Sequence, residues 1–94
     1  MAKKKAYNVP ELPVFNPTAG LAEEYNAKLK GVYRAITDVT IRDRAVTGNI
    51  LRVVHENEEV YCTGNFTNVG KDKWYVVMQD NTIGFIHSGY LKRV

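Results

Sequence analysis

The chain has 94 residues, a net charge of +3 and 45% hydrophobic residues. This length fits one domain, close to the lower limit for a single hydrophobic core without staples. Its only cysteine, Cys62, excludes an internal disulfide. No apolar run approaches the roughly 20 residues that a membrane-spanning helix needs. The chain begins with three lysines within residues 1–5, but no hydrophobic segment follows them. We therefore expect neither a membrane anchor nor a signal peptide.

Residues 1–19 are predicted to form an extended arm, because Pro10, Pro13 and Pro17 disfavour helix. Residues 1–31 hold five lysines against three glutamates, so most of the net charge lies there. Apolar side chains recur between the prolines, which is typical of an arm that lies along a surface. A mobile, solvated tail is the alternative. The candidate docking residues of the arm are Lys3, Lys4, Lys5, Val9, Leu12, Val14 and Phe15.

A short helix is predicted over residues 18–30, about three turns. Thr18 is a suitable N-cap, and Gly31 can end the helix in a left-handed cap. Side chains four residues apart form one apolar stripe, which consists of Leu21, Tyr25 and Leu29. A helix of this length must dock on another element to be stable. Residues 1–31 are therefore expected to be an arm plus a helix ahead of a separate fold.

Residues 32–94 show the alternation and turn residues of short β-strands and no helical period. The clearest part is a hairpin within residues 73–91, with its turn at residues 80–81. We expect Asn57 in a left-handed turn, and Gly84 where a strand bends or another backbone passes close. The other expected strands cover residues 31–37, 38–42, 50–54 and 60–63. Five or six short strands predict an all-β fold, either a small barrel or two packed sheets.

Residues 32–94 resemble the bacterial SH3 (SH3b) domain family. The matching segments are Val39-Thr40-Ile41-Arg42, Trp74-Tyr75-Val76-Val77, Gly84-Phe85-Ile86 and Tyr90-Leu91. The family has a Gly-Pro pair after the arginine, where this chain has Arg44-Ala45, and a turn glycine where it has Asn57. The resemblance implies an SH3-like barrel of five to six short strands.

Domains of this family are non-catalytic modules that bind peptidoglycan peptides or cross-bridges in phage lysins and bacterial wall hydrolases. The resemblance thus implies a binding module without enzymatic activity, synthesised in the host cytoplasm and reaching the wall after lysis. Tethering raises the local concentration of an attached enzyme at its substrate. The alternative is a structural protein of a phage particle, a head or tail decoration whose arm docks on other virion proteins and displays the barrel.

The predicted ligand-binding residues are a charged cluster and three aromatic side chains: Arg42, Asp43, Arg44, Tyr61, Tyr75 and Phe85. The cluster could hydrogen-bond a peptide, and the three aromatic rings, together with that of Tyr90, could provide a rigid contact surface. The alternative for Arg42 is pairing with a neighbouring acid, which would fix the loop. The aromatic residues could instead cover the barrel ends, and Trp74 is expected at the edge of the core.

Other chemistry is not favoured by the sequence. Structural zinc sites need four ligands, usually in two close pairs, whereas His55, His87 and Cys62 are isolated. Cys62 is expected inside a strand as a small buried hydrophobic residue rather than as a nucleophile. Basic residues do not follow any one strand, so nucleic acid is not an expected partner. We expect no metal and no cofactor.

Overall fold

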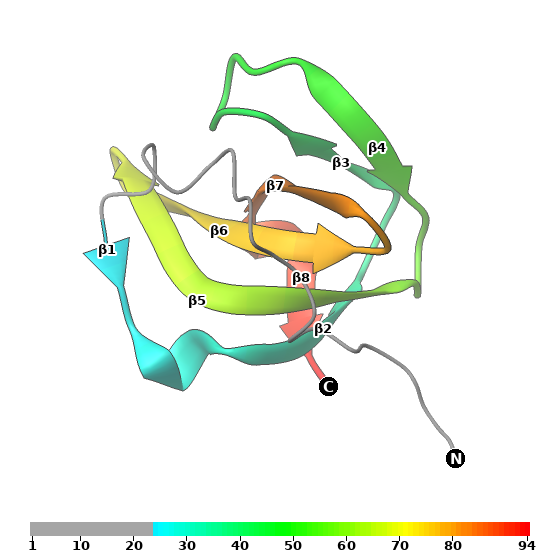
Figure 1. The fold of residues 1–94 in the computed structure, drawn as a ribbon, viewed down its shortest axis with the longest axis horizontal. Coiled ribbons are helices and arrows are strands. Elements are labelled where there is room, and N and C mark those ends of the chain that lie inside the picture. Colours follow the sequence, from blue (N-terminus) through cyan, green and yellow to red (C-terminus); the bar gives the residue numbers. More distant parts are fainter. Residues whose placement is uncertain (1–23) are drawn as a thin grey trace.

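The computed structural model describes residues 24–94. The strands are β1 (Glu24–Tyr25), β2 (Gly31–Ala35), β3 (Val39–Arg42), β4 (Ile50–Val54), β5 (Glu59–Val69), β6 (Asp72–Gln79), β7 (Thr82–His87) and β8 (Leu91–Arg93). Two single-turn 3₁₀ helices, η3 (Ala27–Leu29) and η4 (Ser88–Tyr90), lie before β2 and before β8. All strand pairs are antiparallel, in the order β4-β3-β7-β6-β5-β2-β8, with β1 also on β5. The sheet curls into a half barrel (Figure 1).

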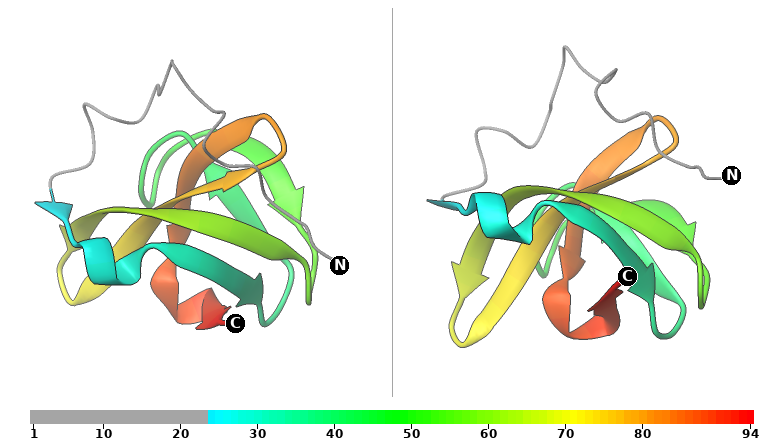
Figure 2. Two further views of the ribbon diagram at one scale, coloured as in Figure 1. Left: turned by 60° about the horizontal axis from the view of Figure 1, so that its bottom comes forward. Right: turned by 90° about the horizontal axis from the view of Figure 1, so that it is seen from below.

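The all-β, barrel-like fold confirms the coarse prediction, but the strands differ in number and length. Residues 24–94 form eight strands instead of the five or six expected, because β1 and β8 are additional. Strand β5 is also longer than expected, since it runs through Gly64 instead of ending at residue 63. Gly64 has a φ of +96°, and the β5–β6 pairing shifts between Cys62 and Phe66. This irregularity lets one strand bend and continue, so β5 and β6 form a long hairpin that spans the molecule (Figure 2).

The predicted helix over residues 18–30 is wrong in its described part, residues 24–30. Glu24–Tyr25 pairs with β5 instead, and only one 3₁₀ turn follows. Asn26 separates the two elements, because its backbone N–H donates to Gly64 at 2.9 Å while its side chain accepts from Lys28 at 2.9 Å. A short isolated helix is marginal in water, and the neighbouring strand offers competing hydrogen bonds. Residues 18–23 lie outside the described residues.

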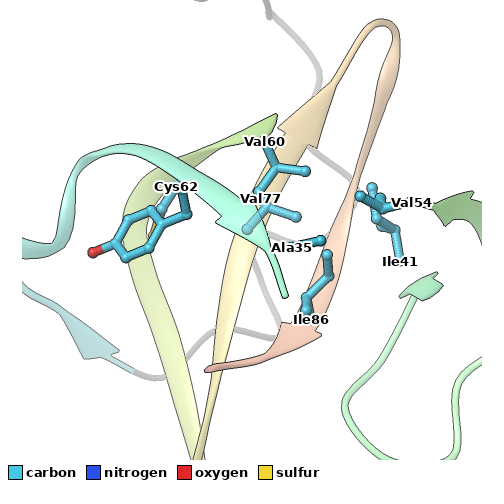
Figure 3. Close-up of a cluster of buried hydrophobic side chains, with 8 residues drawn as sticks. Ala35, Ile41, Val54, Val60, Cys62, Val77 and Ile86 are labelled. Carbon is cyan, nitrogen blue, oxygen red and sulfur yellow. The ribbon is translucent and has the colours of Figure 1, made fainter. Parts of the chain in front are cut away.

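The core lies inside the curl of the sheet (Figure 3). Alternation along each strand directs every second side chain to this side. The buried cluster consists of Tyr33, Ala35, Ile41, Val54, Val60, Cys62, Val77 and Ile86. Cys62 is fully buried within β5, as the sequence predicted. Trp74 on β6 and His87 on β7 alternate with these side chains and lie on the opposite side of the sheet, which we call the outer side. Val76 and Phe85 also lie on this side and are buried.

Three backbone predictions are confirmed. Asn57 has a φ of +73° and Asp80 a φ of +53°, both in the left-handed region that turns require. At Gly84 a Cβ atom would lie 2.5 Å from the carbonyl oxygen of Arg42, so this position needs glycine to let β3 approach β7. Asp80 thus forms the turn of the β6–β7 hairpin, and Gly84 allows the contact of that hairpin with β3.

The predicted arm lies outside the described residues, and so do its candidate docking residues Lys3, Lys4, Lys5, Val9, Leu12, Val14 and Phe15. Within residues 24–94, no helix has the length and apolar character that crossing a bilayer requires.

Candidate functional site

The charged cluster predicted after β3 organises its own loop. The Arg42 guanidinium donates to the carbonyl oxygen of Gly48 at 2.9 Å. The Asp43 carboxylate accepts from the backbone N–H of Asn49 at 2.8 Å and from its side-chain amide at 3.3 Å. Both side chains thus fix the loop of residues 43–49. The alternative interpretation expected Arg42 to fix this loop by pairing with an acid, whereas the partner found is the carbonyl group of Gly48. Arg44 is exposed on this loop.

The three predicted aromatic residues do not lie on one surface. Phe85 is the register partner of Arg42, but its side chain is only 1% exposed. Tyr75 packs against the buried cluster, with its ring 5.6 Å from that of Tyr33. Tyr61 is half-buried and pairs with Met78 on the side of β5 opposite to Cys62. The structure therefore brings Arg42 and Phe85 together and leaves the two tyrosines on opposite sides of the sheet.

A different aromatic group lies on the outer side of the sheet, formed by Trp74, His87 and Tyr90, which we call the aromatic row. Trp74 and His87 are register partners on β6 and β7, with ring centroids 5.2 Å apart at 74°. The ring of Tyr90, from η4, lies 5.3 Å from that of His87. Edge-to-face packing of this kind stabilises aromatic pairs. Tyr90 is 46% exposed, so the row is accessible at one end.

Hydrogen bonds fix the orientation of the central ring of the row. The backbone N–H of Gly89 donates to Nδ1 of His87 at 2.9 Å, so Nδ1 carries the lone pair. In the neutral ring the proton is therefore on Nε2, which lies 3.4 Å from the carboxylate of Asp72. The Asp72 side chain is 58% exposed, so its carboxylate also faces solvent beside the row. The result is a rigid apolar surface with one negative charge at its border.

The sequence contained a signal for this arrangement. In a hairpin with a two-residue turn at 80–81, positions equally far from the turn lie opposite each other. Trp74 and His87 are each six residues from that turn. The pairing follows from the predicted turn, whereas Trp74 taken alone is expected at the edge of the core. The position of Tyr90 on η4 has no comparable signal in the sequence.

The described residues do not place Cys62 or the histidines in a reactive arrangement. Burial raises the pKa of the Cys62 thiol to about 11, which disfavours the nucleophilic thiolate. His55 lies 3.7 Å from Asp38, and both side chains are exposed. Among residues 24–94, His, Cys, Asp and Glu form no group of three or more that could hold a metal ion.

Comparisons with protein-family models, with curated proteins and with solved structures found no match to this chain. What is established is the class of fold, an all-β sheet curled into a half barrel. The resemblance to bacterial SH3 domains rests on the sequence segments quoted above and stays a prediction.

Proposed function

We propose that this chain is a non-enzymatic, SH3b-like binding module of a phage, which recognises the peptide part of bacterial peptidoglycan. It would be made in the host cytoplasm and meet the wall after lysis. The aromatic row beside the Asp72 carboxylate is the observation that carries the proposal. The sequence resemblance over residues 32–94 supports the same ligand class.

The chemistry of the row suits a peptide with amino groups. Aromatic side chains have few rotatable bonds, so they provide contact area at a low cost in conformational entropy. Wall peptides carry ammonium and amide groups, and the exposed Asp72 carboxylate can attract a cation or accept from an N–H group. The row lies on paired strands and a hydrogen-bonded turn, so little reorganisation is needed on binding.

The residues predicted from sequence take different roles in this proposal. Arg44 is exposed and can supply a second polar contact, whereas Arg42 and Asp43 hold the loop that carries it. Phe85 supports the sheet from a buried position, Tyr75 packs partly buried against the core, and Tyr61 is half-buried on β5.

Sedimentation with purified peptidoglycan sacculi tests the proposal. The wild-type chain should pellet with the sacculi, and a Trp74→Ala/Tyr90→Ala double variant should stay in the supernatant. Tyr25→Ala is the matched control, because Tyr25 is an exposed aromatic residue outside the row and should not affect pelleting. Circular dichroism checks that each variant is folded. A wild-type chain that stays in the supernatant with several wall types would refute the proposal.

The second candidate is a structural or accessory protein of the virion. The observation that favours it is the edge strand β4, whose aliphatic side chains Ile50, Leu51 and Val53 are exposed. An assembly component needs such a surface for protein contacts, whereas a wall-binding module does not. Immunogold labelling of intact particles would separate the candidates, since only a virion protein should label the particle in the absence of wall fragments.

A further inference from the structure

The outer side of the sheet carries its own buried apolar side chains, Val76, Met78 and Phe85, which we call the outer apolar group. They are 0%, 7% and 1% exposed. Val76 is the register partner of Phe85, and Met78 lies two positions further along β6, so all three are on the same side as Trp74. None of them belongs to the buried cluster of the core. The sheet thus buries apolar side chains on both of its sides.

The strands and turns of residues 24–94 do not account for this burial. The elements in closest contact with β6 are β5 and β7, its neighbours in the sheet, and η4. Neighbouring strands flank a side chain but do not lie above it, because side chains stand roughly perpendicular to the sheet. η4 meets the sheet where Tyr90 contacts His87, which is the partner of Trp74 and not of Val76. Full burial of Val76 therefore requires a segment that crosses the outer side above β6.

We propose that this segment is the arm of the same chain, residues 9–15, which lies across the outer side of its own sheet. Val9, Leu12 and Phe15 would pack on the outer apolar group. This packing goes beyond the proposed function and does not depend on it. It also gives the arm a different role from docking on other virion proteins, because a segment packed on its own sheet is not free to bind a second protein.

The sequence of residues 9–15, which lie outside the described residues, has the composition and the spacing for this position. Its two prolines favour an extended or polyproline II backbone, which has three residues per turn. Val9, Leu12 and Phe15 follow each other at intervals of three, so they share one side of such a segment. At about 3.1 Å per residue the segment would span about 19 Å, roughly four strand spacings. That length is enough to cross both β6 and β7.

The position of β1 brings the arm within reach of this side. Glu24 is the register partner of Phe66, which pairs with Tyr75 next to Val76. Two strand spacings, about 10 Å, therefore separate Glu24 from β6. The nine residue steps from Phe15 to Glu24 can extend over about 30 Å. The arm can thus reach β6 and β7 of its own sheet, and a second copy is not needed.

Thermal unfolding of the full chain tests the packing. Leu12→Ser/Phe15→Ser should lower the Tm by roughly 10 °C, because two large apolar side chains lose a buried environment. Ile36→Ser/Leu51→Ser is the matched control, since both side chains are already 50% and 46% exposed and the change should lower the Tm by less than about 3 °C. An arm variant that melts no lower than the control would overturn the proposal.

A second measurement identifies the occupant without any variant. In the isotope-labelled full chain, NOEs are expected from the methyl groups of Val76 to the ring of Phe15 and to the methyl groups of Leu12. NOEs from Val76 that reach only residues 24–94 would overturn the proposal. In a mixture of labelled and unlabelled chains, the same NOEs between different copies would assign the outer side to the arm of a second copy and would also overturn it. Pelleting with sacculi enters neither experiment, so failure of this packing is distinct from failure of the proposed function.

Discussion

The guanidinium of Arg93 donates a hydrogen bond to the hydroxyl of Tyr33 at 2.7 Å, and that hydroxyl donates in turn to the carbonyl of Leu29 at 2.9 Å. Arg93 also donates to the carbonyls of Lys28 and Lys30, at 2.8 and 2.6 Å. One side chain of the last strand thus satisfies carbonyl groups in and just after η3, which lack partners at the end of a helix. The Arg93 side chain thus links the last strand, β8, to residues near the beginning of the described part of the chain.

Replacement of Arg93 should loosen this connection. We expect Arg93→Ala to lower the free energy of unfolding by about 1–2 kcal/mol, because it removes three charge-assisted hydrogen bonds at a partly solvated site. Arg93→Lys should recover only part of this loss, because an ammonium group lacks the planar fork that reaches several acceptors. Urea unfolding measures the effect, and Lys92→Ala on the same strand should change stability by less than about 0.5 kcal/mol. Equal effects of the two alanine variants would contradict this role for Arg93.

The close approach of β3 and β7 predicts that Gly84 does not tolerate a side chain. In Gly84→Ala the new Cβ would lie 2.5 Å from the Arg42 carbonyl oxygen and 2.6 Å from Cγ2 of Ile41. One of these contacts is with backbone, so the strands must separate, at a cost of roughly 2–3 kcal/mol. Thermal unfolding should show a clear fall in Tm.

Gly70 provides the comparison for this prediction. It has no atom within 4 Å of an added Cβ, but its φ is +62°. Asparagine tolerates the left-handed region, so Gly70→Asn should have a smaller effect than Gly84→Ala. A Gly84→Ala variant as stable as the wild type would show that β3 can move away without loss.

The buried thiol predicts a dependence of stability on alkaline pH. Burial raises the Cys62 pKa from 9.0 to about 11, so the folded state keeps the thiol proton to a higher pH than the unfolded state does. The corresponding stabilisation is complete below pH 9 and is lost as the pH rises through about 11. The wild type should therefore lose up to about 3 kcal/mol more than Cys62→Ala between these limits. Urea unfolding at pH 8.5 and at pH 11 measures this difference, and equal losses in both proteins would contradict it.

The fold class followed from the sequence because alternation and turn residues act locally. Residues 80–81 form the predicted turn, and that turn alone fixes the pairing of Trp74 with His87. The segment before β2 was mispredicted because its helical spacing competes with hydrogen bonds to β5, which the sequence does not display. Local propensity is overridden when a neighbouring strand satisfies the same backbone groups.

The candidate site was harder to predict because it depends on which side of a strand each residue occupies. Tyr61 and Cys62 are adjacent in sequence but lie on opposite sides of β5. Beyond Cys62 the pairing with β6 shifts by two residues before it resumes at Phe66 and Tyr75. Without that register, aromatic residues on different sides of the sheet look like one group. The aromatic row is found only when the strands are paired.

The carboxylate beside the aromatic row predicts a salt-sensitive contribution to ligand binding. Trp74 is the only tryptophan of the chain, so its fluorescence should change when a soluble wall peptide binds to the row. Asp72→Asn keeps the shape of the side chain but removes its charge, and we expect affinity for an amine-bearing peptide to fall roughly 5- to 10-fold at low salt. High salt should narrow the difference between the two proteins, because the lost attraction is screened. Glu56→Gln removes an exposed acid between β4 and β5, outside the row, and should bind like the wild type. If Asp72→Asn and Glu56→Gln weaken binding equally, the effect is one of net charge, and Asp72 does not contact the ligand.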